Sequence, residues 1–134
     1  MIIVALTIVG LTTPASAEDA IPAGAKAACE NFSVLGATGD AAKLAEGFYS
    51  ERAMFIGPAP VAGIIIGREA IQKNYAGGFK TFKAISGTCE NFVLLNATTV
   101  AASGHWMMTP IDPNGRIIKG SYGITVRIRR RPPD

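Results

Sequence analysis

The sequence predicts an α+β domain in which helices cover one face of an antiparallel sheet, and three observations support this class. Between Pro22 and Ala76 the apolar residues recur mainly at helical spacing, interrupted by two short apolar runs. From Lys83 onward apolar and polar residues alternate, which is typical of antiparallel strands with one solvated face. The 134 residues are 49% hydrophobic and 17% charged. This composition suffices for one core and excludes a disordered or coiled-coil chain.

Apolar stripes and characteristic end residues mark the first two helices. The first is expected from Pro22 to Leu35, just before Gly36, and the second opens on Asp40 as its N-cap. The residues expected to face inward are Ala25, Ala28, Cys29, Phe32 and Leu35 in the first helix, and Ala41, Leu44, Ala45 and Phe48 in the second.

Two short strands and a third helix follow. Ala53–Ile56 is expected to be a short strand. It ends at the Gly57-Pro58-Ala59-Pro60 segment, which neither a helix nor a central strand tolerates. Ile64–Ile66 is β-branched throughout and predicts a second strand, which Gly67 ends. Arg68–Ala76 then predicts a helix whose inward residues are Ala70, Ile71 and Tyr75.

The rest of the chain predicts three long strands. They are Lys83–Leu95, Thr99–Thr109 and a third that begins near Arg116. Asp112-Pro113-Asn114-Gly115 separates the last two, and its Asn-Gly ending is a strong hairpin signal. The residues expected on the helix-covered face are Ile85, Cys89, Val93 and Leu95, then Val100, Ala102, Gly104, Trp106 and Met108, then Ile118, Tyr122, Ile124, Val126 and Ile128.

Residues 1–17 predict a secretory signal peptide. The apolar run Ile2–Leu11 is shorter than the roughly 20 residues that a membrane span needs. Pro14 and the small-residue motif Ala15-Ser16-Ala17 follow it, so we expect cleavage after Ala17 and a single mature domain over residues 18–134. No Lys or Arg precedes the apolar run, and the alternative is a buried N-terminal strand. A cleaved signal would place the protein in the periplasm or outside the cell, without a stable membrane anchor.

Export changes how the two cysteines are interpreted. In an oxidising compartment Cys29 and Cys89 favour one disulfide, and the alternative is a pair of buried free thiols. A bridge that closes a loop of about 60 residues would stabilise the fold by roughly 4 kcal/mol. Two cysteines and one histidine do not make a metal-binding set, so we expect neither a metal nor another cofactor.

The formal net charge of +3 comes from the C-terminal end of the chain. Four arginines lie there, and without them and Asp134 the acidic and basic residues balance. A neutral body with a basic tip is not the charge pattern of a nucleic-acid-binding domain, so we expect no nucleic-acid partner. The four arginines are Arg127, Arg129, Arg130 and Arg131.

Several segments carry a family resemblance. Residues 39–45 and 48–55 together resemble the "G-D-x-x-x-L-x-x-x-Y-x-x-D-A" segment of the NTF2-like superfamily, and residues 67–71 resemble the "G-R-E-A-I" that opens its third helix. Residues 104–106, 112–115 and 120–122 resemble its SnoaL-like and DUF4440 branches. The resemblance covers about residues 24–128. It implies a cone, made of a curved antiparallel sheet wrapped by about three helices around an apolar cavity, and a homodimer.

The superfamily contains both enzymes and non-enzymatic binding modules, so the resemblance alone does not assign a function. Ketosteroid isomerase needs a carboxylate base and a hydroxyl-bearing oxyanion donor. Here Gly57 stands at the position of the base and Phe32 at that of the donor tyrosine. Arg52 replaces the acidic residue that usually precedes the first strand in this family. Isomerase chemistry by the known arrangement is therefore not expected. Members of the superfamily generally continue with another strand, so the resemblance implies that the domain at residues 18–134 is truncated at its C-terminal end.

The candidate site is a ligand pocket with no recognisable catalytic set. Its expected lining is aromatic, and the alternative is that these rings belong to an ordinary core. His105 is a candidate base at the mouth of the cavity, and it is a weak candidate because no carboxylate is recognisable beside it. The alternative is that it is a polar residue on the outer side of the sheet. Tyr49 and Tyr75 carry hydroxyls that could orient a ligand. The expected lining residues are Phe32, Phe48, Phe55, Trp106 and Tyr122.

We therefore expect an exported domain that binds a small, largely apolar molecule and forms a homodimer. Two alternatives remain open at this stage. One is a SnoaL-like lyase, cyclase or isomerase that uses His105 or a tyrosine. The other is a non-catalytic dimerisation module.

Overall fold

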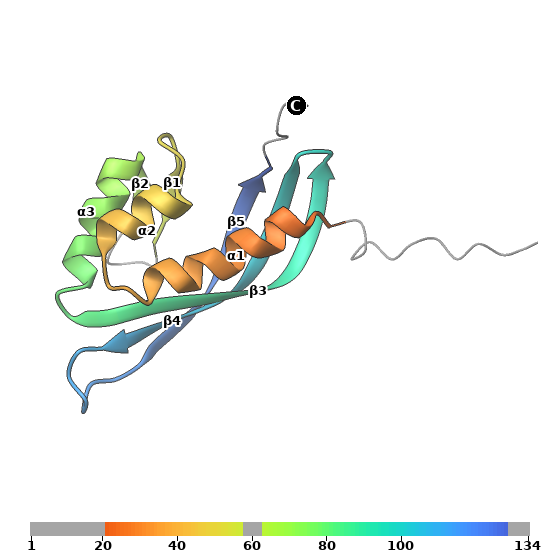
Figure 1. Cartoon of the computed structure of the whole chain (residues 1–134). Coiled ribbons are helices and arrows are strands. Elements are labelled where there is room, and N and C mark those ends of the chain that lie inside the picture. Colours follow the sequence, from red (N-terminus) through yellow and green to blue (C-terminus); the bar gives the residue numbers. More distant parts are fainter. Residues whose placement is uncertain (1–20, 58–62, 129–134) are drawn as a thin grey trace, which may run out of the picture.

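Three helices and five strands make up the computed structural model, which describes residues 21–57 and 63–128 (Figure 1). The α+β class and the curved antiparallel sheet with helices on one face are confirmed. The signal peptide expected at residues 1–17 and Arg129–Arg131 lie outside the described residues. In order, the elements are α1 (Ala23–Gly36), α2 (Ala41–Phe48), β1 (Met54–Ile56), β2 (Ile64–Ile66), α3 (Arg68–Gly78), β3 (Phe82–Asn96), β4 (Thr99–Pro110) and β5 (Ile118–Arg127).

The helix ends follow the local chemistry that the sequence indicated. Helix α1 starts directly after Pro22, whose fixed φ suits the first turn of a helix. Helix α2 is capped by Asp40, whose carboxylate accepts hydrogen bonds from the backbone N–H groups of Ala42 and Lys43, both at 3.0 Å. Helix α3 follows Gly67, which has a φ of 94°, a backbone conformation that glycine adopts without strain.

The strands form two separate antiparallel sheets. Strands β1 and β2 pair as a hairpin, and β3, β4 and β5 form a sheet in that order. The turn between β4 and β5 is the expected one: the N–H of Gly115 donates to the carbonyl of Asp112 at 2.9 Å, and the N–H of Asn114 donates to the carboxylate of Asp112 at 2.9 Å. In Figure 1, α1 lies along the three-stranded sheet, while α2, α3 and the hairpin gather at one end of it.

Four residues that were expected to face inward are exposed: Val93 and Leu95 of β3, Ala70 of α3, and Ile118 at the start of β5, which is 44% exposed. Val93 and Leu95 of β3 are 59% and 57% exposed instead of facing the helices. The β3–β4 register shifts between Cys89 and Asn91, and an irregularity of this kind exchanges the two faces of a strand. Phe92 therefore packs inward where the simple alternation predicted Val93. On α3, Ile71 and Tyr75 are buried as expected, but Ala70 is exposed.

Helix α1 connects two groups of buried residues. Near its start, Ile21 and Ala25 pack with Val100 of β4. Near its end, Phe32 joins residues from α2, α3 and β3. The one long helix therefore fixes both ends of the sheet, and the second group is the one that carries the candidate site. Its buried members are Phe32, Leu44, Ile71, Tyr75 and Ile85.

Candidate functional site

Seven aromatic side chains form a continuous series between the helices and the sheet, and we call this set the aromatic cluster. Neighbouring rings have centroids between 4.9 and 6.4 Å apart, which is the range of favourable ring pairs. The series runs from β5 through α1 and α2 to the hairpin and α3. Its members are Phe32, Phe48, Tyr49, Phe55, Tyr75, Phe79 and Tyr122.

Glycines in the sheet make room for rings on its inner face. A Cβ atom at Gly87 would lie 3.0 Å from the ring of Phe32, and one at Gly120 would lie 2.5 Å from the indole of Trp106. Gly87, Trp106 and Gly120 are direct neighbours across the three strands. Any larger residue at either glycine would displace a ring, so these positions shape the floor beneath the cluster.

A pair of tyrosine hydroxyls lies inside the cluster. The hydroxyl oxygens of Tyr49 and Tyr75 are 2.7 Å apart, and either can donate to the other. Burial raises the pKa of Tyr49 to about 12 and raises the pKa of Tyr75 further still. Both are therefore protonated near neutral pH. Two hydroxyls carry two hydrogens, and their mutual bond uses only one of them.

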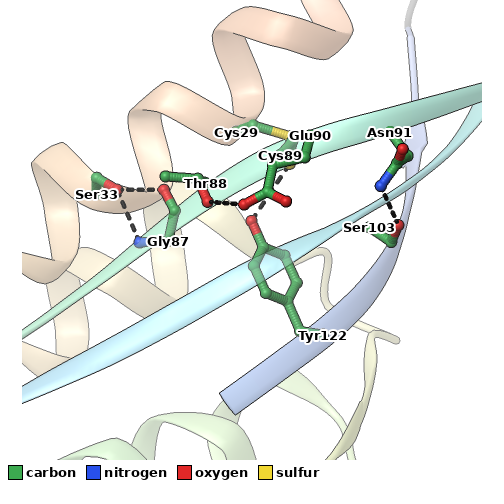
Figure 2. Close-up of a disulfide and its surroundings, with 9 residues drawn as sticks. All are labelled: Cys29, Ser33, Gly87, Thr88, Cys89, Glu90, Asn91, Ser103 and Tyr122. Carbon is green, nitrogen blue, oxygen red and sulfur yellow. Dashed lines mark hydrogen bonds between the residues drawn. A yellow bond between two sulfur atoms is a disulfide. The ribbon is translucent and has the colours of Figure 1, made fainter. Parts of the chain in front are cut away.

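A third tyrosine links the cluster to the disulfide. Cys29 of α1 and Cys89 of β3 are bonded, with their Cα atoms 5.9 Å apart. The hydroxyl of Tyr122 lies 3.2 Å from Sγ of Cys89, as Figure 2 shows. Burial, followed by the negative charge of Glu90, raises the pKa of Tyr122. The disulfide expected from the sequence is thus present, and it contacts an aromatic residue of the site.

Ser33 adds a second link between α1 and β3. Its hydroxyl donates to the carbonyl of Gly87 at 2.6 Å and accepts from the N–H of Gly87 at 2.9 Å (Figure 2). Gly87 and Cys89 are two residues apart on the same strand face, so the disulfide and this pair of hydrogen bonds act together. Together they fix the position of α1 relative to β3, and therefore also the position of the Phe32 ring on the sheet.

The structure brings together four of the five residues that the sequence assigned to a pocket lining. Phe32, Phe48, Phe55 and Tyr122 belong to the aromatic cluster. Trp106 lies on the same face of the sheet, over Gly120. The hydroxyl pair could not be derived from the sequence, because nothing in the spacing of α2 and α3 indicates that Tyr49 meets Tyr75.

His105 lies on the outer face of the sheet, opposite the aromatic cluster. Its Nδ1 is 2.7 Å from a carboxylate oxygen of Glu90, and the two side chains are 64% and 49% exposed. The hydroxyl of Thr88 donates to the same oxygen at 3.1 Å. The hydrogen bond from His105, and then that from Thr88, lowers the pKa of Glu90. A carboxylate does therefore orient this histidine, contrary to the interpretation of the sequence, but on the far side of the sheet from the rings.

The rings themselves occupy much of the space between the helices and the sheet. Among the described residues, two shallow surface hollows lie elsewhere, near the start of α3. One measures about 360 Å³ and is lined by Glu46, Arg68, Glu69 and Gln72; the other measures about 440 Å³ and includes Glu51, Ile66 and Lys73. Neither is lined by the aromatic residues.

Within residues 21–57 and 63–128, no three His, Cys, Asp or Glu side chains gather in a way that could hold a metal ion. No helix in those ranges is both long and apolar enough to cross a membrane.

Solved structures with the same architecture identify the fold. An NTF2-like protein from Anabaena variabilis shares 20% identity at a TM-score of 0.56 over 90% of this chain and 87% of its own. A proposed scytalone dehydratase from Novosphingobium aromaticivorans shares 19% at 0.58 over 78% and 72%. A ketosteroid isomerase-like protein from Erwinia carotovora atroseptica shares 14% at 0.53 over 78% and 82%. No known protein family and no curated protein matches the chain by sequence. Identities at this level establish a common fold.

Proposed function

We propose that this chain, which has the NTF2-like fold, binds a small, largely apolar molecule at the aromatic cluster and holds one polar atom of it with the Tyr49–Tyr75 pair. The observation that carries the proposal is the Tyr49–Tyr75 hydroxyl pair. Two neutral hydroxyls 2.7 Å apart share one hydrogen bond, and among residues 21–57 and 63–128 no other group bonds to either of them, so one hydroxyl hydrogen is left over beside the aromatic rings. A buried donor without an acceptor is costly, and a ligand that supplies an acceptor removes that cost.

The chemistry of the surroundings restricts the class of ligand. The rings favour a flat or alicyclic molecule, since stacked and edge-to-face contacts stabilise such shapes. The hydroxyl pair favours a single acceptor atom, such as a ketone oxygen. Only Phe32 and Tyr75 of the aromatic cluster are fully buried, so a ligand would reach the cluster past partly exposed rings such as Tyr49 and Phe55. Because the rings are packed together, binding requires these partly exposed side chains to move aside.

The second candidate function is catalysis by a lyase, cyclase or isomerase, as in the SnoaL-like branch. The same hydroxyl pair favours it, because a neutral tyrosine can donate to a carbonyl oxygen on which negative charge develops. His105 does not support it, since the structure places this residue on the opposite face of the sheet. The enzyme proposal therefore depends on Tyr49 or Tyr75 and not on His105.

Export and dimer formation complete the proposal. A disulfide between Cys29 and Cys89 is consistent with an oxidising compartment, such as the periplasm or the exterior of the cell. We propose that the mature domain functions there as a homodimer.

The test uses the single tryptophan of the chain, Trp106, as its reporter. The oxidised protein is titrated with 2-acetonaphthone, which carries one ketone acceptor, and with 2-ethylnaphthalene, which carries none. Saturable quenching with about five-fold tighter binding of the ketone is expected, because one hydrogen bond contributes roughly 1 kcal/mol. Tyr49→Phe combined with Tyr75→Phe should abolish this preference while both hydrocarbon frames still bind, whereas Tyr75→Phe alone leaves the hydroxyl of Tyr49 free to donate.

His105→Ala, on the outer face, is the matched control and should keep the preference. The absence of saturable binding by either probe would overturn the binding proposal. Saturable binding with equal affinities in the wild type would overturn the role of the hydroxyl pair. Turnover is assayed separately, by incubating the protein with enolisable ketones in D₂O and measuring α-deuteration by mass spectrometry. Exchange that depends on Tyr49 or Tyr75 would favour the enzyme.

A further inference from the structure

The β1–β2 hairpin is apolar on both of its faces. Its six strand residues are Met-Phe-Ile and Ile-Ile-Ile, paired so that Met54 is opposite Ile66 and Ile56 is opposite Ile64. The central pair, Phe55 and Ile65, packs against the core. The other four residues point the opposite way, and we call them the hairpin face. They are Met54, Ile56, Ile64 and Ile66.

All four residues of the hairpin face are strongly exposed in the isolated chain. The exposed fractions are 61% for Met54, 71% for Ile56, 68% for Ile64 and 70% for Ile66. Their direct pairing across the two strands makes them one contiguous patch instead of scattered residues. Contiguous apolar patches on soluble domains usually mark an interaction surface.

Strand β5 of the same chain shows what a solvent-facing strand looks like here. Apart from Gly123, its outward residues are polar or charged, while the alternate residues Tyr122, Ile124 and Val126 face inward. An antiparallel strand with one wet face alternates in this way, whereas a strand covered on both faces is apolar throughout. The hairpin has the second pattern although the described residues, 21–57 and 63–128, cover only one of its faces. The outward residues of β5 are Lys119, Ser121, Gly123, Thr125 and Arg127.

Two ion pairs lie beside the hairpin face. Arg68 pairs with Glu51 at 3.2 Å, and Lys73 pairs with Glu69 at 3.1 Å. These four residues border the same surface hollow as Ile66. A border with two acids and two bases can face an identical border without net repulsion, because each acid of one copy can approach a base of the other.

We propose that the hairpin face is the interface with a second copy of this chain, related by a twofold axis. The inference rests on the proposed homodimer and assigns its contact surface. In a twofold dimer the same patch serves both subunits, so an apolar centre with a charge-balanced border is self-complementary. It also has the usual anatomy of an interface, in which an apolar core is surrounded by a polar rim.

The experiment measures oligomeric state by analytical ultracentrifugation of the oxidised protein between about 1 and 100 μM, a range that covers typical weak and moderate dimers. Wild type should sediment as a dimer at the upper concentrations. Ile56→Asp and Ile66→Asp, made singly, should each weaken dimerisation at least 100-fold and give monomers. The matched control is Val34→Asp, because Val34 is also apolar and 66% exposed but lies on α1. This control should leave the dimer intact.

A mixing experiment separates loss of the interface from loss of the fold. Ile56→Asp and Ile56→Lys, each monomeric alone, should form a heterodimer when mixed, since opposite charges then meet across the interface. Unfolded variants would not do so. A wild-type monomer at 100 μM would overturn both the dimer and this interface. A wild-type dimer that persists in both aspartate variants, or that is also lost in Val34→Asp, would overturn the interface alone. Binding of 2-acetonaphthone is measured on the same samples, so the ligand proposal stands or fails independently.

Discussion

The hydroxyl of Tyr122 lies 3.2 Å from Sγ of Cys89, so one residue of the aromatic cluster touches the disulfide that joins α1 to β3. The ring of the same tyrosine stacks on Phe32 of α1 at a centroid distance of 6.3 Å. Helix, strand and ring are therefore held as one unit. The disulfide therefore both stabilises the fold and helps to position two rings of the candidate site, those of Phe32 and Tyr122.

Removing the bridge should lower stability substantially. Cys29→Ser combined with Cys89→Ser opens a loop with a sequence separation of 60 residues. The chain-entropy model predicts a loss of about 4 kcal/mol in the free energy of unfolding, which urea titration measures. Wild type treated with dithiothreitol should show the same loss. A decrease below about 1 kcal/mol would mean that the bond contributes little to the native state.

Alkaline titration should report the burial of all three tyrosines. Burial is the leading cause that raises the pKa values of Tyr49, Tyr75 and Tyr122, and that of Tyr49 moves from 10.0 to about 12. The tyrosinate absorbance at 295 nm should therefore stay low at pH 10 in the native protein and develop at pH 10 in guanidinium. A raised pKa means that the unfolded state loses its proton first. The stabilising contribution is complete below pH 10 and falls as the pH rises from 10 through about 12.

Tyr75→Phe identifies the part of this signal that belongs to the hydroxyl pair. The variant retains the ring contacts with Phe55 and Phe79 but removes one hydroxyl, so it should lower stability by about 1 kcal/mol. Its remaining absorbance change should still begin above pH 10. Ordinary titration near pH 10 in the native wild type would show that these hydroxyls are accessible to solvent, contrary to the structure.

His105→Ala should affect Glu90 but not the site. The hydrogen bond from His105 is the main cause that lowers the pKa of Glu90, so its loss should return that pKa toward its ordinary value, as carboxyl ¹³C NMR would measure. A carboxylate whose pKa is lowered by folding stabilises the native state at pH values above its unfolded pKa. That contribution to stability is lost as the pH falls through the folded pKa. Because both groups are exposed, we expect little change in stability at neutral pH. Weaker binding of 2-acetonaphthone in this variant would contradict the placement of His105 away from the site.

Local patterns predicted most of the fold. The cap at Asp40, the run Ile64–Ile66 and the turn at residues 112–115 occur where the sequence indicated them, because each depends on the chemistry of a few neighbouring residues. Val93 and Leu95 were placed on the wrong face, since a register shift depends on how two strands meet and not on either strand alone. Alternation carries no information about such a shift.

The candidate site was predicted only in its apolar part. Aromatic residues at inward positions could be found from periodicity, which is why Phe32, Phe48 and Tyr122 were identified. The contacts between polar groups could not be found in this way. The Tyr49–Tyr75 bond joins residues 26 positions apart and the His105–Glu90 bond joins residues 15 apart, and both are fixed by tertiary packing.

The floor of the site gives a prediction with an internal control, because β5 contains two glycines in different surroundings. A Cβ atom at Gly120 would lie 2.5 Å from the indole of Trp106, whereas one at Gly123 would have its nearest neighbour at 3.8 Å. Gly120→Ala must therefore displace the indole or the strand, and we expect a loss of about 1 to 3 kcal/mol. Because Trp106 is the only tryptophan, its fluorescence maximum should shift in the same variant.

Gly123→Ala adds the same methyl group to the same strand without meeting a ring. It should be neutral or stabilise by up to about 1 kcal/mol, because alanine loses less backbone entropy than glycine on folding. The tryptophan spectrum should remain that of the wild type. Equal losses of stability in the two variants would show that β5 is simply intolerant of alanine. A loss confined to Gly120→Ala, together with weaker binding of 2-acetonaphthone, would show that the space above this glycine is occupied by the ring that borders the ligand site.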